Sequence, residues 1–526
     1  MKRYPFYKNE PINSIVQLIE RSENLYGDSI AIKYKKKKAL YEKSYRDLAN
    51  DSRQLAQYLL NQSFQKGHIA VLGSSSYEWI VTYLGTVFAG FVIVPLDKEL
   101  PANELYELII HADVECLFYE AQYADIIDSL KCDYHLSISL HSFEEISSLQ
   151  YETVPLPTVD PDKLSAILFT SGTTGKSKGV MLTQRNIASN VIQGLGAVDI
   201  QHDKDVLLSV LPFNHAYAFT GTLMFLYKGA TVCISSGLKY MQKEFVEYKP
   251  TLMFVVPLLT EKLYEKIELT VKKENKEKVF SFALKMCKFL KKLNIDLTNI
   301  LFAEIKSAFG GKLEKILCGG ATLNEELIEK FDSVGINLLQ GYGLTECSPL
   351  LTANLDYYHR PNSVGKLVEG NYVKIVDGEI WAKGSSVSKG YYNEPKETKK
   401  NFEDGWFKTG DLGSIDEDNF VYITGRKKNL IILNNGENVS AEELENLIYK
   451  IPYVSEVLVY GKNQKIVAEI YIDPENNIEA SEMNVEIDRL NRNIPAYKNI
   501  DQIILRDVPF EKTTTKKIKR YKQQED

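Results

Sequence analysis

Residues 169–180 read FTSGTTGKSKGV, and this stretch says most about how the chain folds and what it handles. An apolar, strand-like run over 165–169 leads into a series of small and hydroxyl residues, and Lys176 and Lys178 follow. Backbone N–H groups of such small residues can turn inward around an anion, while hydroxyls add donors and a lysine adds charge. The pattern predicts a phosphate-binding loop made of Thr170, Ser171, Gly172, Thr173, Thr174, Gly175 and Lys178.

The loop is close to a Walker A sequence without being one. Gly175-Lys176-Ser177 could close the pattern G-x-x-x-x-G-K-[ST], but the opening glycine would have to stand where the chain has Thr170. No helix is expected directly after the lysine, because Gly179 and Val180 follow. Taken alone, the loop leaves three interpretations open: a kinase-like NTPase, another nucleotide chemistry, or a polar turn between strands.

Four further motifs follow in order along the rest of the chain. They are Gly319-Gly320-Ala321, the run GYGLTE over 341–346, the run WFKTGDL over 406–412 with GRKK over 425–428, and KTTTKKIKR over 512–520. Together with FTSGTTGKSKGV they resemble the motifs of the adenylate-forming superfamily, which includes acyl-CoA synthetases, firefly luciferase and the adenylation domains of nonribosomal peptide synthetases. Among these, the chain looks most similar to bacterial long-chain fatty acid–CoA ligases.

Hydrophobic patterning predicts an α/β fold. Short apolar, β-branched runs alternate with helical patterns, for example over 69–72, 79–88 and 91–94, which indicates mostly parallel, helix-covered sheets. From residue 371 the strands become shorter, as in a small β-barrel-like subdomain, and a small α+β lobe follows. The resemblance supplies the boundary that composition does not mark: an N-terminal adenylate-forming domain over 1–426 and a mobile C-terminal lobe over 427–526.

The resemblance implies how an adenine nucleotide would be bound. Tyr342, between Gly341 and Gly343, matches the tyrosine whose ring lies flat on the purine in the family. The three small residues Gly319, Gly320 and Ala321 allow a ligand to approach the backbone at the carboxyl end of a strand. A core tyrosine and a tight strand-to-helix turn are the alternative structural interpretations.

The end of GYGLTE carries the residue types that phosphate and metal need. Thr345 can donate its hydroxyl to a phosphate oxygen, and we expect it to act in catalysis. Glu346 offers a hard carboxylate for Mg²⁺ bound to ATP. The alternative for Glu346 is a partner of a helix N-terminus. Asp411 in KTGDL matches the residue that accepts both ribose hydroxyls, and Arg426 matches one that reaches the ribose or the phosphate.

The resemblance also implies two further catalytic positions, but each has an alternative interpretation. His215 stands where relatives place a ring beside the reacting carboxylate, although a lone histidine is more often structural. Lys517 aligns with the lysine that bridges the carboxylate and the α-phosphate during adenylation. Relatives usually have glycine just before this lysine, whereas this chain has Lys516, so the register could slip by one residue.

Two positions concern the second half of the reaction. Lys428 sits at the family's hinge between the lobes. Gly436 matches the glycine that lines the tunnel for the thiol's pantetheine arm. The following run over 438–441, Asn-Val-Ser-Ala, departs from the commoner asparagine–isoleucine–tyrosine–proline, so the thiol acceptor is less firmly implied than the adenylation.

The implied activity is a ligase reaction in two half-steps that uses ATP, Mg²⁺ and CoA or the phosphopantetheine of a carrier protein. Amino-acid-activating relatives carry an aspartate after the residue matching Phe213, but Asn214 and His215 stand here, which disfavours an amino acid. The helical, lysine-rich stretch over 261–309 resembles that of bacterial fatty acyl-CoA synthetases, so a medium- or long-chain fatty acid is expected. Two alternatives remain: an acyl-(carrier protein) ligase, and a non-catalytic acyl- or nucleotide-binding relative.

Composition sets the remaining limits. The chain has 526 residues, which is too long for one hydrophobic core. A net charge of −7 disfavours a general binder of nucleic acid or anionic membranes. The N-terminus shows no apolar signal core, no apolar run is long enough to span a bilayer, and the six cysteines form no C-x-x-C pair, so we expect a cytoplasmic protein with reduced thiols.

Overall fold

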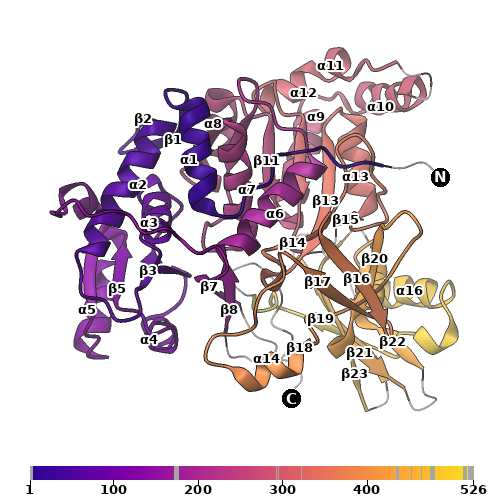
Figure 1. The fold of residues 1–526 in the computed structure, drawn as a ribbon. Coiled ribbons are helices and arrows are strands. Elements are labelled where there is room, and N and C mark those ends of the chain that lie inside the picture. Colours follow the sequence, from indigo (N-terminus) through magenta and orange to yellow (C-terminus); the bar gives the residue numbers. More distant parts are fainter. Residues whose placement is uncertain are drawn as a thin grey trace.

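The computed structural model describes residues 4–170, 177–291, 293, 295–321, 323–433, 437–451, 453–463, 465–473, 480–512, 518 and 520. The chain forms two helix-covered sheets, a smaller antiparallel sheet and a C-terminal α+β unit (Figure 1). The predicted α/β class is therefore confirmed.

The first sheet has six strands in the order β6-β5-β3-β4-β7-β8. The five strands from β6 to β7 run parallel, and β8 returns antiparallel to β7. β3 and β4 are buried along their whole length, as expected for strands covered on both faces. The bounds are β3 (His68–Leu72), β4 (Val92–Leu96), β5 (Cys116–Tyr119), β6 (Ser139–Ser142), β7 (Leu164–Thr170) and β8 (Lys178–Thr183).

The second sheet has nine strands in the order β15-β14-β13-β12-β11-β9-β10-β1-β2. Its middle strands are parallel, and the additions at both edges are antiparallel. The bounds are β1 (Ile30–Lys36), β2 (Ala39–Ser44), β9 (Val206–Ser209), β10 (Thr231–Ile234), β11 (Leu252–Val255), β12 (Lys315–Cys318), β13 (Asn337–Gly343), β14 (Leu350–Ala353) and β15 (Lys366–Leu367).

One hydrophobic core joins these two sheets. It contains Ile93 and Leu168 of the first sheet and Val232 and Phe254 of the second, with α3, α6 and α7 between them buried on nearly all sides. The helices of the two sheets are α1 (Ile15–Tyr26), α2 (Tyr45–Leu60), α3 (Tyr77–Phe88), α4 (Ala102–His111), α5 (Ala124–Cys132), α6 (Gln184–Ala197), α7 (Ala216–Lys228), α8 (Met241–Tyr248) and α13 (Glu325–Ser333). Short 3-10 turns are η1 (Ala121–Tyr123), η2 (Phe143–Ser148) and η3 (Leu238–Tyr240).

The helical stretch between β11 and β12 packs against the second sheet through its own core. This core includes Tyr264 of α9, Cys287 of α10 and Phe331 of α13. The bounds are α9 (Pro257–Lys273), α10 (Glu277–Lys291), α11 (Thr298–Leu301) and α12 (Ala303–Ala308). The predicted helical character of residues 261–309 is confirmed. None of the described helices is both long and apolar enough to cross a bilayer.

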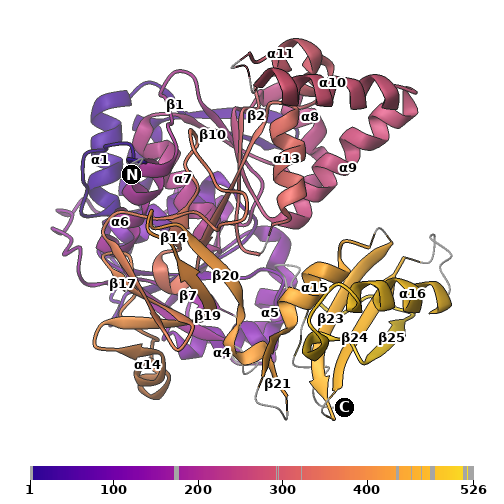
Figure 2. The same cartoon turned by 90° about the vertical axis from the view of Figure 1, so that its right-hand side faces the viewer.

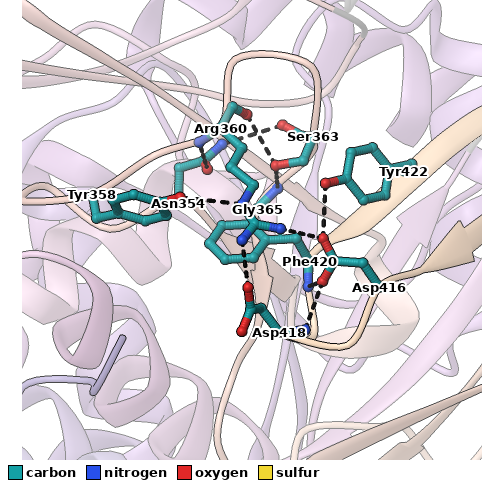
Figure 3. A network of polar contacts seen from close by, with 9 residues as sticks. All are labelled: Asn354, Tyr358, Arg360, Ser363, Gly365, Asp416, Asp418, Phe420 and Tyr422. Carbon is teal, nitrogen blue, oxygen red and sulfur yellow. Dashed lines mark hydrogen bonds and ion pairs between the residues drawn. The ribbon is translucent and has the colours of Figure 1, made fainter. Parts of the chain in front are cut away.

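The third sheet is antiparallel, in the order β16-β17-β19-β18, with β20 paired to β19. Figure 3 shows how it is tied to the second sheet: the Arg360 guanidinium, on the loop after β14, pairs with Asp416 and Asp418 and lies 4.2 Å from the centre of the Phe420 ring. The bounds are β16 (Asn371–Val376), β17 (Glu379–Gly384), α14 (Pro395–Asn401), β18 (Phe402–Glu403), β19 (Trp406–Ile415) and β20 (Val421–Arg426).

The C-terminal unit is connected to β20 by the 3-10 turn η5 (Lys427–Asn429). Its core, which includes Val439, Leu444, Val459 and Ile470, is separate from the other clusters. Figure 2 shows this unit at one side of the molecule. The bounds are β21 (Leu430–Ile432), β22 (Asn438–Ser440), α15 (Ala441–Ile448), β23 (Val454–Lys462), β24 (Lys465–Ile472), α16 (Ala480–Asn491), η7 (Ala496–Lys498) and β25 (Gln502–Arg506). The division at 426/427 stays a prediction.

Candidate functional site

The predicted phosphate loop is the tip of the β7–β8 hairpin. Thr170 ends β7, Lys178 begins β8, and the two residues are cross-strand partners. The hairpin explains why no helix follows the lysine and why the Walker A geometry, in which a helix opens at the loop, does not apply. Ser171, Gly172, Thr173, Thr174 and Gly175 lie outside the described residues.

Lys178 is held at the base of this hairpin. Its ammonium forms an ion pair with Glu397 of α14 and lies 5.2 Å from the centre of the Tyr391 ring. The ammonium correspondingly lowers the pKa of Glu397. The phenol of Tyr391 donates a hydrogen bond of 2.8 Å to Oε1 of Glu346. Tyr391 therefore links the phosphate-loop lysine to the carboxylate predicted to hold a metal.

Glu346 lies in the 3-10 turn η4 (Thr345–Cys347), directly after β13, and Thr345 opens this turn. The carbonyl of Glu346 accepts a 2.7 Å hydrogen bond from the N–H of Ser388. Desolvation raises the pKa of the Glu346 carboxyl, while the Tyr391 hydrogen bond and the charges of Arg426 and Lys178 act in the opposite direction. A carboxylate in this environment is poised to gain from a cation.

The other half of GYGLTE connects to the third sheet. Tyr342, near the end of β13, donates a 2.6 Å hydrogen bond from its phenol to Oδ2 of Asp411 on β19. Burial raises the pKa of Tyr342 well above its usual range, so the phenol remains a donor. A side chain on Gly343 would come within 1.8 Å of the Pro349 carbonyl, so this position needs glycine. Gly341 also pairs across to Ala353 of β14.

Asp411 is a buried carboxylate with both oxygens held. Oδ1 accepts from Nε of Arg426 at 2.8 Å, and only 4% of the Asp411 side chain is exposed, against 41% of Arg426. The two residues are cross-strand partners in the β19–β20 hairpin. Each carboxylate oxygen has a second lone pair, so Asp411 can still accept further hydrogen bonds.

The glycine-rich turn follows β12. Gly319, Gly320 and Ala321 stand beside the end of β13, because Cys318 of β12 pairs with Gln340 of β13 in parallel register. Gly320 has φ +90°, a conformation that L side chains rarely adopt. A Cβ on Gly319 would meet the Tyr217 ring at 3.3 Å, so the ring fills the space that glycine leaves.

His215 is the residue before α7, and its carbonyl accepts the N–H of Ala218 in the first turn. Tyr217, two residues further, contacts Gly319 and donates a 2.9 Å hydrogen bond to the Leu317 carbonyl. The start of α7 therefore lies beside the glycine-rich turn. His215 is half-buried at that position.

The residues predicted for the C-terminal lobe are only partly described. Lys428 lies in η5, where partial desolvation and the positive charges of Arg426 and Arg520 lower the pKa of its ammonium. Gly436 and Lys517, with Lys516, lie outside the described residues. Arg520, just beyond them, pairs with Glu445 of α15.

Several residues at this site escaped the sequence analysis. Tyr391 and Glu397 stand 45 and 219 positions from their partners Glu346 and Lys178, and no periodicity connects residues so far apart. Glu379 is another: it accepts from the Gly410 N–H at 3.0 Å and pairs with Lys427 at 2.8 Å. The only available signal was that Glu346 and Lys178, as partly buried charges, each needed a partner.

Comparison with known proteins agrees with this arrangement. The model of the AMP-binding enzyme family matches residues 19–392, and that of the AMP-binding enzyme C-terminal domain matches residues 428–526. The chain belongs to the AMP-binding enzyme family. The resemblance to the adenylate-forming superfamily seen in the sequence is thereby confirmed.

Members of this family with similar sequences are named as acyl-CoA ligases. Long-chain-fatty-acid–CoA ligase FadD15 of Mycobacterium bovis is 29% identical over 468 residues, covering 82% of this chain and 77% of that protein. Fatty acyl-CoA synthetase B of Dictyostelium discoideum is 30% identical over 472 residues, covering 78% and 68%. The structure of o-succinylbenzoate CoA synthetase from Bacillus subtilis with OSB-AMP shares the fold, with a TM-score of 0.79 at 21% identity, and covers 99% of this chain and 98% of that one.

Proposed function

We propose that this AMP-binding enzyme is an ATP-dependent fatty acid–CoA ligase. In the first half-step, a carboxylate oxygen of the acid attacks the α-phosphorus of ATP, the bond to the β-phosphate breaks, and pyrophosphate leaves. In the second, the CoA sulfur attacks the acyl carbon, and AMP leaves as the thioester forms. The thiol proton is lost to solvent or a base. The reaction would take place in the cytoplasm.

The observation that carries the proposal is a pair of contact sets that meet at the run GYGLTE over 341–346. Arg426, Asp411 and Tyr342 are joined by hydrogen bonds of 2.8 and 2.6 Å, and Glu346 follows Tyr342 in the same run, in the 3-10 turn after β13. Tyr391 then connects Glu346 to the hairpin that bears the phosphate loop. An aromatic ring, a buried carboxylate and a phosphate loop are the groups that the purine, ribose and phosphates of one nucleotide need close together.

We assign the nucleotide roles accordingly. The Tyr342 ring would cover the purine, with Gly319, Gly320, Ala321, Gly341 and Gly343 giving the ligand close access to the backbone. Asp411 would accept the ribose hydroxyls through its remaining lone pairs, with Arg426 beside it. The loop from Thr170 to Gly175, with Lys178, would hold the β- and γ-phosphates, and Thr345 the α-phosphate.

Magnesium would enter with ATP rather than as a resident ion. Among the described residues, no group of three or more His, Cys, Asp or Glu side chains is placed to hold a metal. Mg²⁺ commonly takes one or two carboxylates and completes its octahedron with phosphates and water. Glu346 fits this pattern, because one of its oxygens is bound to Tyr391 and desolvation raises its pKa.

The fatty acid is supported by two arguments. Relatives over most of the chain are named long-chain fatty acid–CoA ligases. Asn214 and His215, where amino-acid-activating enzymes carry an aspartate, provide no carboxylate for an α-ammonium. His215, at the start of α7 beside Gly319, would stand next to the reacting carboxylate.

The C-terminal lobe would serve both half-steps by rotating about Lys428. One arrangement would bring Lys517 to the α-phosphate, where its ammonium stabilises the charge that builds up at phosphorus. The other would withdraw it and bring Gly436 to the pantetheine arm of the thiol.

The test measures each half-step. Carboxylate-dependent exchange of labelled pyrophosphate into ATP, across acids of C2 to C18 and aromatic acids, reports adenylation and the preferred substrate. AMP release is then measured with CoA and with phosphopantetheinylated carrier protein. Long-chain acids with CoA should be the best pair. A preference for the carrier protein would favour the alternative ligase, and absence of any exchange would favour a non-catalytic binder.

Lys517→Ala offers a sharper test of the catalytic assignment. We expect it to abolish pyrophosphate exchange while leaving CoA-dependent consumption of supplied acyl-AMP, because Lys517 would act in one arrangement only. Lys516→Ala is the matched control and should have the milder effect. The reverse ranking of the two variants would move the catalytic amine to Lys516.

A further inference from the structure

Two described segments near the end of the chain lie side by side. Lys512 and Ile518 face each other as partners in an antiparallel bridge, so both ends of the interval between them are at the same place. The interval, 513–517, lies outside the described residues and includes Lys517. Because Lys517 is bonded directly to Ile518, whatever holds Ile518 also limits where Lys517 can be.

The segment before the interval is fixed by a buried carboxylate. Glu456 of β23, a residue 8% exposed, accepts the Phe510 N–H at 2.7 Å through Oε2 and pairs with Lys512 at 2.5 Å through Oε1. The Phe510 ring is also buried, in a small apolar cluster that includes Leu458 and Tyr460. We call Glu456 with Lys512 the Glu456 anchor.

The segment after the interval is fixed by a second buried carboxylate. Arg520 pairs with Glu445 of α15, whose side chain is 10% exposed, and donates a 3.3 Å hydrogen bond to the Val459 carbonyl of β23. Ile518 packs against the same apolar cluster as Phe510. We call Glu445 with Arg520 the Glu445 anchor.

The Glu445 anchor also reaches the proposed hinge. Nη2 of Arg520 lies 3.8 Å from Oε1 of Glu442, and the same oxygen accepts a hydrogen bond from the Asn429 side chain of η5. The segment that follows Lys517 is therefore tied to the turn about which the C-terminal unit would rotate.

Stability alone is a weak explanation for these two anchors. Burying a charge costs solvation, and a buried ion pair seldom stabilises a protein more than an apolar pair of the same size. The main core of the C-terminal unit, with Val457 and Ile470, does not include Phe510 or Ile518. The ion pairs therefore contribute more to the position of the two segments than to the core.

We propose that Glu456 and the Glu445–Arg520 pair are positioning residues that hold the Lys517 ammonium in place for adenylation. The proposal rests on the proposed function, in which Lys517 stabilises charge at the α-phosphorus. A lysine ammonium is carried on a flexible stem, so the backbone that bears it must be fixed if the charge is to be placed within about an ångström. Lys517 has no part in the second half-step, so the anchors should matter only in the first.

The test removes each anchor without leaving a buried charge unpaired. In Arg520→Met/Glu445→Gln, the glutamine oxygen can still accept the Val459 N–H that Glu445 accepts at 2.7 Å. We expect this variant to lower the kcat of pyrophosphate exchange by about 10²-fold with little change in the KM for ATP. CoA-dependent consumption of supplied acyl-AMP should stay within about twofold of the parent rate.

Glu456→Gln/Lys512→Met makes the same change at the other anchor. The glutamine oxygen can still accept the Phe510 N–H, and we expect the same selective loss of exchange. Arg520→Lys keeps a cation beside Glu445 and should retain more exchange than the double variant at that anchor.

The matched control is Lys498→Met/Glu443→Gln. It removes an ion pair of 2.6 Å that also joins α15 to a later segment, η7, and neither residue belongs to an anchor. The control should behave as the parent does in both half-reactions.

A second measurement does not depend on activity. Trypsin cleaves after lysine, and the chain has lysines at 516, 517 and 519. Without substrate, cleavage at these positions, located by mass spectrometry, should be about tenfold faster in each anchor variant than in the parent or the control. If the parent shows no pyrophosphate exchange, the ligase proposal fails, and the trypsin comparison still tests whether the anchors hold this part of the chain.

The two measurements together decide the proposal. Equal loss of both half-reactions in the anchor variants would mean that the anchors only stabilise the C-terminal unit, and would overturn it. Exchange at the parent rate in both anchor variants, or tryptic cleavage at the parent rate, would also overturn it.

Discussion

At the scale of single residues, the candidate site consists of partly buried charges that satisfy one another. Asp411, with 4% of its side chain exposed, has a hydrogen bond on each oxygen. Glu346 has one from Tyr391 and an environment that raises its pKa. The two carboxylates therefore differ: Asp411 is already fixed by a cation, whereas Glu346 has more to gain from one.

Glu346→Gln should lower pyrophosphate exchange by about 10²-fold or more, because it removes the one negative charge proposed to hold Mg²⁺ against the phosphates. The amide can still accept the Tyr391 hydrogen bond, so the fold should be preserved. Exchange is measured at a series of Mg²⁺ concentrations, with Glu107→Gln on α4 as the control. Wild-type activity of the variant at limiting Mg²⁺ would exclude the metal role.

The sequence predicted some of these residues better than others. The glycine motifs could be located because Gly320 needs a positive φ and Gly343 leaves no room for a Cβ, and both requirements are local. The partners of Glu346 and Lys178 could not be located from the sequence, because Tyr391 and Glu397 reach them through tertiary packing alone. Asp411 could be taken for a turn residue from its sequence, but it lies within β19.

At the scale of secondary-structure elements, the parallel pairing of β12 with β13 brings the Gly319–Ala321 turn and Tyr342 to the same sheet edge. The alternation of strands and helices predicted this edge, because ligands bind at the carboxyl ends of parallel strands. The pattern could not predict the contact between α15 and β23, where Glu445 accepts the Val459 N–H at 2.7 Å and pairs with Arg520.

Burial raises the pKa of Glu445 to about 7, although the nearby Arg520 charge opposes the shift. Because this folded-state pKa lies above the value of about 4.3 in an unfolded chain, protonation favours the folded lobe. That stabilisation is complete below about pH 4, is lost as the pH rises toward 7, and changes little above. We therefore expect the amides of β23 to exchange faster with deuterium at pH 7.5 than at pH 5.5, after correction for intrinsic rates.

Glu445→Gln should remove this pH dependence, since the amide does not titrate. Glu443→Gln is the control. Glu443 lies on the same helix as Glu445 and is an exposed partner of Lys498, so this variant should keep the pH dependence. The same pH dependence in the wild type, Glu445→Gln and Glu443→Gln would mean that Glu445 does not cause it.

At the scale of the whole molecule, the chain is divided into several hydrophobic cores, and the core of the C-terminal unit is separate from the others. Polar contacts cross η5: Lys427 pairs with Glu379, and the Ser440 hydroxyl donates a 2.8 Å hydrogen bond to the Thr424 carbonyl. Composition does not mark this junction, because it contains no run of Gly, Pro or Ser. Its position at 426/427 came from the family resemblance, and the C-terminal family match begins at residue 428.

The last prediction concerns rotation at this junction. Proline fixes φ near −65° and restricts the residue before it, so Lys428→Pro should hold η5 in one conformation. At position 428 itself, the φ of a 3-10 turn lies in the range that proline adopts. We expect the variant to keep pyrophosphate exchange and to lose CoA-dependent AMP release, because the second half-step needs the other arrangement. Lys428→Ala, which removes the charge and leaves φ free, should do much less. If Lys428 is an ordinary exposed loop residue, proline will be harmless or will reduce both half-reactions equally, and measuring the two separately in one preparation distinguishes these outcomes.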